Sequence, residues 1–332
     1  MDDPPPVAIA AAADPIAELI TTWNELNGGV IEELQAEPSP FEFLRYVARN
    51  TPFVVRRGAA DWPATRRWDA AYLRRALGRH GVNVAVTPFG NADAPTSIGG
   101  KKTGDDDDGD ELVFAKPHEE DQPFEDFLTF LQRQELDPAF REGDGEVRYA
   151  QTQNDNLRHE YVSLFSEVER SVAFARIALG AEPEAINMWV GNSRSTTALH
   201  KDNYENVYVQ VAGRKHFVLL SPLCQPCVNE RDLAPATYVR VGDGELQLQM
   251  DEDAKGDGVV GETNGSGARD GLEDGDRASV ASEDEKSNSD KVPFAIWDPE
   301  LPDRRRTPYS HLARPIKVTL DPGDMLYLPA MW

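Results

Sequence analysis

Hydrophobic positions in the first 135 residues recur mostly at the three- and four-residue spacing of helices. This spacing predicts helices over residues 8–36, 41–48, 72–80 and 124–134, the first of them ending near Asn27-Gly28-Gly29. Two short apolar segments between these helices predict strands at 52–56 and, with alternation at period two, at 82–86. We therefore expect residues 1–146 to form a helical and mixed α/β extension.

Beyond Val147 the pattern changes to short runs rich in β-branched and aromatic residues, separated by turns. These runs predict strands at residues 147–150, 186–190, 206–211, 217–220, 316–320 and 325–329. Short strands punctuated by turns such as Ala212-Gly213-Arg214 are typical of a β-sandwich or barrel. The expected fold is therefore mainly β from residue 147 to residue 332.

Two strongly acidic segments interrupt this pattern. Residues 241–292 hold fifteen acidic side chains against five basic ones, and residues 99–111 hold six against two. Like-charge runs with few aromatic residues cannot bury enough apolar surface to offset the cost of ordering the backbone. We expect both segments to be disordered insertions.

The composition narrows the range of partners. The chain has 332 residues and a net charge of −24, which disfavours binding to a nucleic-acid backbone or an anionic membrane. No segment approaches the ~20 apolar residues of a membrane helix, and Met1-Asp2-Asp3 lacks the basic flank of a signal peptide. The two cysteines, Cys224 and Cys227, are expected to be reduced thiols in a turn. These features predict an intracellular protein, cytoplasmic or nuclear; its oligomeric state stays open.

His200 and Asp202 are the first candidates for chemistry. In an extended chain, residues two positions apart face the same side, so an imidazole and a carboxylate are presented together while Lys201 points away. These are two of the three donors in the 2-His-1-carboxylate triad that binds non-haem Fe(II). Alone, a His-x-Asp pair is more often a hydrogen-bonded surface couple than a metal site.

The segments around this pair resemble a known family. The motifs, in chain order, are Phe53-Val54-Val55-Arg56, Tyr149-Ala150-Gln151, Asn187-Met188-Trp189-Val190-Gly191, Leu199-His200-Lys201-Asp202, Tyr204-Glu205-Asn206, Gly213-Arg214-Lys215-His216-Phe217, Pro235-Ala236-Thr237-Tyr238 and Gly323-Asp324-Met325-Leu326-Tyr327-Leu328-Pro329. They resemble the Jumonji-C (cupin-like) 2-oxoglutarate oxygenases, and among them the lysyl-hydroxylase group of Jumonji-C domain protein seven. The resemblance extends from about Phe41 to Trp332.

The resemblance implies a double-stranded β-helix, the cupin or jelly-roll fold, for residues 147–332. It implies that His200 and Asp202 bind Fe(II), with no catalytic residue beyond the metal centre. It further implies that 2-oxoglutarate is held by four side chains, Tyr149, Thr197, Asn206 and Lys215. From the residues alone, Tyr149 could be an ordinary core tyrosine, Asn206 a hydrogen-bonding residue of the barrel, and Lys215 a solvated hairpin lysine.

The resemblance also implies the reaction, which is hydroxylation of a lysine side chain in a protein substrate, with a translation-associated GTPase as one candidate. A basic substrate suits an acidic protein. A protease or phospholipase is disfavoured, because the sequence contains neither Gly-x-Ser-x-Gly nor His-Glu-x-x-His.

One departure from the family pattern concerns the third iron ligand. In the family a second ligand histidine follows the segment equivalent to 326–332 by a few residues, whereas this chain ends at Trp332. We therefore expect a C-terminally truncated fragment with weak or no activity, the alternative being a non-catalytic cupin-like binding protein. The other histidines are expected to be structural or exposed: His80, His118, His159, His216 and His311.

Overall fold

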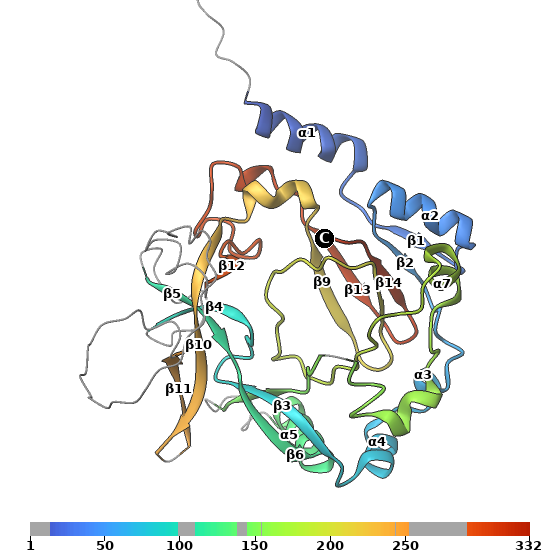
Figure 1. Ribbon diagram of the computed structural model, residues 1–332, viewed down its shortest axis with the longest axis vertical. Helices are drawn as coiled ribbons and strands as arrows, with labels where there is room; N and C mark the ends of the chain where they lie inside the picture. The colour runs from blue at the N-terminus through green and yellow to red at the C-terminus, as the bar shows by residue number, and fades with distance from the viewer. Residues whose placement is uncertain (1–13, 99–109, 138–144, 154, 243, 252–290) are drawn as a thin grey trace, which may run out of the picture.

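The computed structural model describes residues 14–98, 110–137, 145–153, 155–242, 244–251 and 291–332. Its strands run around a centre that is crossed by the irregular segment leading to residue 205, while most of the helices lie on the outside (Figure 1). No helix among the described residues has both the length and the apolar character needed to cross a membrane. The predicted mainly β fold is therefore confirmed.

The strands of the described residues form four sheets. One has the order β1-β2-β14-β8, and another has the order β11-β10-β5-β4 with β12 also paired to β10. The two smaller sheets are β13-β9 and β6-β3-β7. The bounds are β1 Glu32–Leu34, β2 Phe53–Val55, β3 Gly81–Thr87, β4 Ala94–Ser97, β5 Leu112–Lys116, β6 His118–Pro123, β7 Val147–Tyr149, β8 Asn206–Val209, β9 Lys215–Leu219, β10 Glu230–Val241, β11 Glu245–Met250, β12 Val292–Ala295, β13 Ile316–Leu320 and β14 Met325–Leu328.

Side-chain caps mark the start of the first two helices. Asp14 accepts hydrogen bonds from the first turn of α1, and Ser39 forms a reciprocal capping box with Glu42 at the start of α2. The helices are α1 Pro15–Asn27, α2 Pro40–Arg49, α3 Pro63–Arg67, α4 Ala70–Leu77, α5 Phe124–Leu136 and α7 Ala173–Leu179, with 3₁₀ helices η1 Val162–Glu167, η2 Pro222–Cys227 and η4 Ser310–Leu312.

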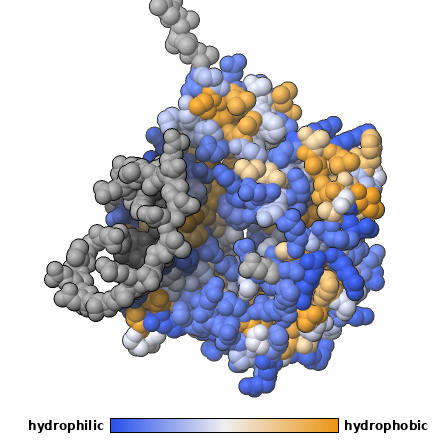
Figure 2. Space-filling view, viewed as in Figure 1, coloured by the Kyte–Doolittle hydropathy of each residue, from blue (hydrophilic) through white to orange (hydrophobic). Residues whose placement is uncertain are grey.

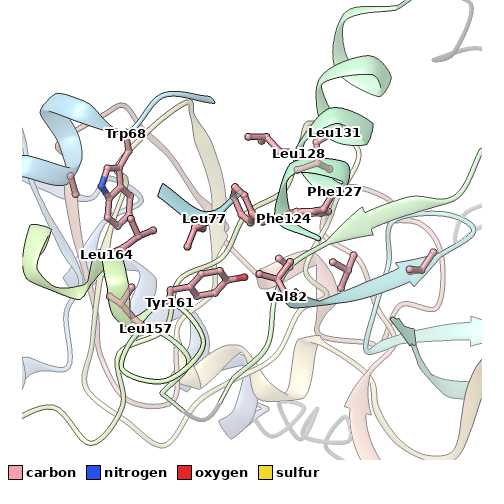
Figure 3. Close-up of a cluster of buried hydrophobic side chains, with 14 residues drawn as sticks. Trp68, Leu77, Val82, Phe124, Phe127, Leu128, Leu131, Leu157, Tyr161 and Leu164 are labelled. Carbon is pink, nitrogen blue, oxygen red and sulfur yellow. The ribbon is translucent and has the colours of Figure 1, made fainter. Parts of the chain in front are cut away.

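Buried side chains tie these elements together. In one cluster, the rings of Phe174 in α7 and Tyr327 in β14 pack edge to face against Phe43 in α2. Their centroids lie 5.1 Å and 4.8 Å from that of Phe43, respectively. A second cluster joins β3 and α5 to the segment around Tyr161, whose ring lies between Leu157 and Val82 (Figure 3). This second cluster contains side chains from before and after Val147, so the core is continuous across the predicted boundary between residues 146 and 147. The division of the chain at that boundary stays a prediction.

The surface keeps some apolar side chains. Hydrophobic colour gathers over α1 and over the edge formed by α2 and α7 (Figure 2). There Leu19, Phe41 and Ile177 are exposed.

Two predicted elements differ from the structure near the N-terminus. The helix predicted over 8–36 is α1, which ends at Asn27 because Gly28 adopts φ +67°, and residues 32–34 are strand β1, parallel to β2. The helix predicted over 72–80 ends at Leu77, where Gly78 has φ +44°. The first helix thus ends at the predicted stop near Asn27-Gly28-Gly29, whereas Gly78 ends the second one before the predicted His80.

The strand predicted at 186–190 is wrong. Only Val190 pairs, through an isolated bridge to Ala150. Both backbone polar groups of Met188 are instead hydrogen-bonded to the side chain of Asn156. Asn156 accepts from the Met188 N–H at 2.7 Å and donates to the Met188 carbonyl at 2.9 Å. Side-chain hydrogen bonds of this kind compete with a strand ladder.

The acidic segments were predicted to be disordered, and this is wrong for part of the second one. Residues 245–250 form β11, which pairs with β10 from Ala236 to Val241. Leu246 and Leu248 alternate with polar residues there, which suits a strand with one covered face. Residues 99–109 and 252–290 lie outside the described residues.

Candidate metal and co-substrate site

His200 and Asp202 lie in the irregular segment that leads into β8. The Asp202 carbonyl accepts a hydrogen bond from the Met331 N–H at 2.7 Å, which holds this segment against the turn after β14. His200 Nε2 and Asp202 Oδ2 are 3.9 Å apart, and their side chains are 48% and 49% exposed. The two donors predicted from the sequence therefore face each other at an accessible position.

Hydrogen bonds orient both donors. His200 Nδ1 lies 2.8 Å from the Ala198 carbonyl, an acceptor, so Nδ1 carries the proton and Nε2 keeps its lone pair for a metal. Asn206 Nδ2 donates to Asp202 Oδ2 at 3.3 Å. Asn206 was predicted to line the co-substrate side, and its side-chain hydrogen bond is to Asp202 of the metal pair.

The donor set fits part of an iron centre. An imidazole nitrogen and a carboxylate oxygen this close together can bind one cation, and they are two of the three donors of a facial triad. In the described part of the chain, no group of three His, Cys, Asp or Glu side chains could hold a metal ion. Two other histidines are hydrogen-bonded elsewhere: His216 to Thr319 Oγ1 at 2.9 Å and His80 to the Glu160 carbonyl at 2.6 Å.

Lys215 opens β9 and meets Tyr149 at the end of β7. Lys215 Nζ donates to the Tyr149 hydroxyl at 3.4 Å and lies 5.5 Å from the ring centroid. Burial lowers the pKa of Lys215. Burial also raises the pKa of Tyr149 to about 12, although a hydrogen bond from Thr197 acts in the opposite direction. The structure thus brings together three of the four predicted co-substrate residues.

This group offers hydrogen-bond donors without a matching anion. Among the described residues, no carboxylate lies within ion-pair distance of Lys215 Nζ. Tyr149 accepts a hydrogen bond from Lys215, so its own hydroxyl proton is left to donate. A part-buried ammonium beside a hydroxyl donor is suited to a carboxylate ligand, because the ligand would supply the missing negative charge.

The hydropathy pattern alone did not identify the residues that shape this site. Gly191 lies against Tyr149, and a Cβ added there would come within 2.7 Å of Tyr149 Cδ2 and 2.5 Å of Ser195 Oγ. Trp189 stacks on Tyr208 with ring centroids 5.9 Å apart. Both Gly191 and Trp189 belong to a segment that carried the family resemblance, which was the available signal.

The cysteine pair lies away from these groups. Cys224 and Cys227 are free, buried thiols on η2, and Cys227 Sγ lies 3.2 Å from the Tyr309 carbonyl. They pack with Ile20 and Trp297 in a small core cluster. The predicted reduced thiols are thus present, in a 3₁₀ helix.

The fold defines a cupin-type protein, in which His200, Asp202 and Lys215 form a candidate site for a metal and an anion. The profile of the family described as "Cupin-like domain" matches residues 38–332, and the chain belongs to this cupin-like, Jumonji-C family. The predicted family resemblance and the predicted fold class are confirmed.

Relatives support the same assignment. The chain is 32% identical over 300 residues to the "Bifunctional peptidase and (3S)-lysyl hydroxylase JMJD7" of Homo sapiens, covering 90% of this chain and 77% of that protein. It is 31% identical over 330 residues to the "Lysine-specific demethylase JMJ32" of Arabidopsis thaliana, covering 95% and 80%. It is also 28% identical over 315 residues to the "JmjC domain-containing protein E" of Dictyostelium discoideum, covering 91% and 76%.

Proposed function

We propose that this protein is an Fe(II)- and 2-oxoglutarate-dependent oxygenase that hydroxylates a lysine side chain of a protein substrate. The observation that carries the proposal is the part-buried Lys215 ammonium, which meets the Tyr149 hydroxyl and no carboxylate of the described residues. A part-buried ammonium without a negatively charged partner is energetically unfavourable unless a ligand neutralises it. Family membership supports an oxygenase of this type.

In the proposed mechanism, one end of the site binds the metal and the other end binds the co-substrate. His200 Nε2 and the Asp202 carboxylate would hold the iron, which when bound supplies the activation of oxygen. Lys215 binds the distal carboxylate of 2-oxoglutarate through its ammonium, and the hydroxyl of Tyr149 donates to the same carboxylate. Thr197, whose side chain lowers the pKa of Tyr149, would present a further hydroxyl to the same carboxylate.

The substrate class is supported by the names of the relatives. The human relative is named a lysyl hydroxylase and the Arabidopsis relative a lysine-specific demethylase, so both names specify lysine. We extend this to a lysine side chain of a protein here, with a translation-associated GTPase as the first partner to test. The net charge of −24 favours the approach of a basic segment.

Binding of 2-oxoglutarate is the first test. The 332-residue protein, loaded with Mn(II) without oxygen, should bind 2-oxoglutarate, followed by tryptophan fluorescence or calorimetry. Lys215→Ala should lose this binding, whereas the matched Lys201→Ala should keep it, because Lys201 lies outside the group and pairs with Glu230 at 3.0 Å. Absence of 2-oxoglutarate binding in the unaltered protein would contradict the proposal.

Turnover separates the oxygenase from its rival. A non-catalytic cupin-like binding protein is favoured by the two-donor metal pair, since no third donor joins it among the described residues. With Fe(II), ascorbate and oxygen, an oxygenase converts 2-oxoglutarate to succinate, which NMR measures directly. Binding without any succinate would favour the binding protein, and addition of 16 Da to a lysine peptide would establish hydroxylation.

A further inference from the structure

Asp93 is a charged side chain near the site that has no role in the mechanism above. It stands immediately before β4, and its φ of +53° is a conformation that residues other than glycine seldom adopt. Gln151 Nε2 donates to Asp93 Oδ2 at 3.0 Å. Since Gln151 follows Tyr149 by two positions, this contact ties Asp93 to the end of the strand that carries the co-substrate group.

The turn that carries Asp93 contacts the segment that leads to the metal pair, because the Thr196 N–H donates to the Gly90 carbonyl at 2.7 Å. Burial raises the pKa of Asp93, and so does Glu119, while Gln151, Lys116 and His200 lower it. Lys116 is already engaged, because its ammonium forms an ion pair with Asp251. The contacts of Gly90 with Thr196 and of Asp93 with Gln151 therefore hold this turn against the segments that carry His200 and Tyr149.

Asp93 lacks a counter-ion in the described part of the chain. None of the ion pairs among the described residues includes it, and its side chain accepts a hydrogen bond from the neutral amide of Gln151. A part-buried carboxylate without a cation is unfavourable, so a group that supplies a positive charge at this position would be bound preferentially.

We propose that Asp93 binds the side-chain ammonium of the substrate lysine and thereby selects a cationic residue over neutral ones. This inference rests on the proposed function. Because the turn of Asp93 contacts the segment before His200, an ammonium held beside Asp93 would bring the carbon chain of the same lysine toward His200 and Asp202. A neutral side chain in the same place would leave the carboxylate unpaired, and discrimination of this kind is strong because it leaves a buried polar group unsatisfied.

A purely structural role predicts a different result from the variant Asp93→Asn. Asparagine keeps an oxygen that accepts from Gln151 and tolerates positive φ, so the turn before β4 should be preserved. Only the charge is removed. Asp61→Asn is the matched control, because the Asp61 side chain is 91% exposed and pairs with Arg66 near the start of α3.

The experiment uses the full chain and three fluorescein-labelled nonapeptide libraries with a fixed central residue: lysine, acetyl-lysine or norleucine. Binding to the Mn(II)- and 2-oxoglutarate-loaded protein is followed by fluorescence anisotropy. The unaltered protein and Asp61→Asn should prefer lysine by about 10-fold, and Asp93→Asn should reduce that preference to about 2-fold or less. Affinity for 2-oxoglutarate should stay the same in all three proteins.

Each contrary result has a distinct meaning. If the unaltered protein binds the three libraries equally, the inference is overturned. It is also overturned if Asp93→Asn keeps the full preference for the lysine library. If the protein binds no 2-oxoglutarate, the proposed function is contradicted. The library measurement is then repeated with Mn(II) alone. The lysine preference of the unaltered protein, and its loss in Asp93→Asn, then test the role of Asp93 separately.

Discussion

The two ends of the site differ in how much of their surroundings the protein itself provides. At the co-substrate end, Lys215 and Tyr149 are part-buried and contact each other across β9 and β7. At the metal end, His200 and Asp202 are about half exposed and 3.9 Å apart. The fold therefore arranges the proposed anion-binding end in advance, whereas the proposed metal end would depend more on a bound ion, and substitutions should separate these two contributions.

The largest effect is expected at the co-substrate end. Lys215→Ala removes the cation that would neutralise a bound dicarboxylate, at a cost of about 4 kcal/mol. This corresponds to about 1,000-fold weaker binding of 2-oxoglutarate. Calorimetric titration of the Mn(II)-loaded protein measures it, with Lys201→Ala as the control. Unchanged affinity would mean that the two ends do not differ in the way described.

At the metal end, His200→Ala should weaken Mn(II) binding by at least about 100-fold, since even changes in the partners of metal ligands cost 10- to 100-fold. Electron paramagnetic resonance of free Mn(II) gives the affinity. His216→Ala is the control, because His216 is bonded to Thr319. Equal losses in the two variants would argue against His200 as a ligand.

Gly191→Ala tests the preformed end without removing a charge. The added methyl group would press on Tyr149 and Ser195, and overpacking of this kind costs about 1 to 3 kcal/mol. We expect about 10-fold weaker 2-oxoglutarate binding with Mn(II) affinity unchanged. Gly29→Ala is the matched control, because nothing lies within 4 Å of its added Cβ. A loss of metal affinity as large as that of 2-oxoglutarate would show that the two ends are not independent.

The smallest effect concerns pH. Lys215 binds a carboxylate only when protonated, and burial lowers its pKa below the ordinary value of 10.5. Affinity for 2-oxoglutarate should therefore be retained at pH values below the lowered pKa and decline as the pH rises through it. Lys215→Arg, if it binds at all, should show no such decline, because a guanidinium stays protonated. A pH profile shared by both proteins would assign the decline to another group.

Local patterns predicted the strands whose apolar positions are regular, such as β3 and β13. They missed β6, whose sequence is almost entirely polar and which is a strand because it pairs with β3 from Gly81 to Val86. They also missed β10, a long strand that contains a proline and begins with charged residues. In these elements, tertiary pairing decides the structure against local propensity.

The site shows the same division. His-x-Asp spacing and the family motifs indicated His200, Asp202, Lys215, Tyr149 and Thr197, because these positions lie in recognisable segments. They gave no role to Asp93 or Gln151, which are 58 positions apart and meet only in the folded chain. Asn206 was indicated by its motif, but its side-chain contact depends on the rotamer it adopts beside Asp202.

Strand β14 also constrains the order in which the protein can be assembled during synthesis. It lies between β2 and β8, with Met325 opposite both Val55 and Val209. A nascent chain folds from its N-terminal side, and pairings between distant segments form slowly. While the ribosome has yet to release residues 325–328, β2 and β8 each lack this neighbour. The segment that bears His200 and Asp202 leads directly into β8, so we expect its final position to be set only after translation has passed β14.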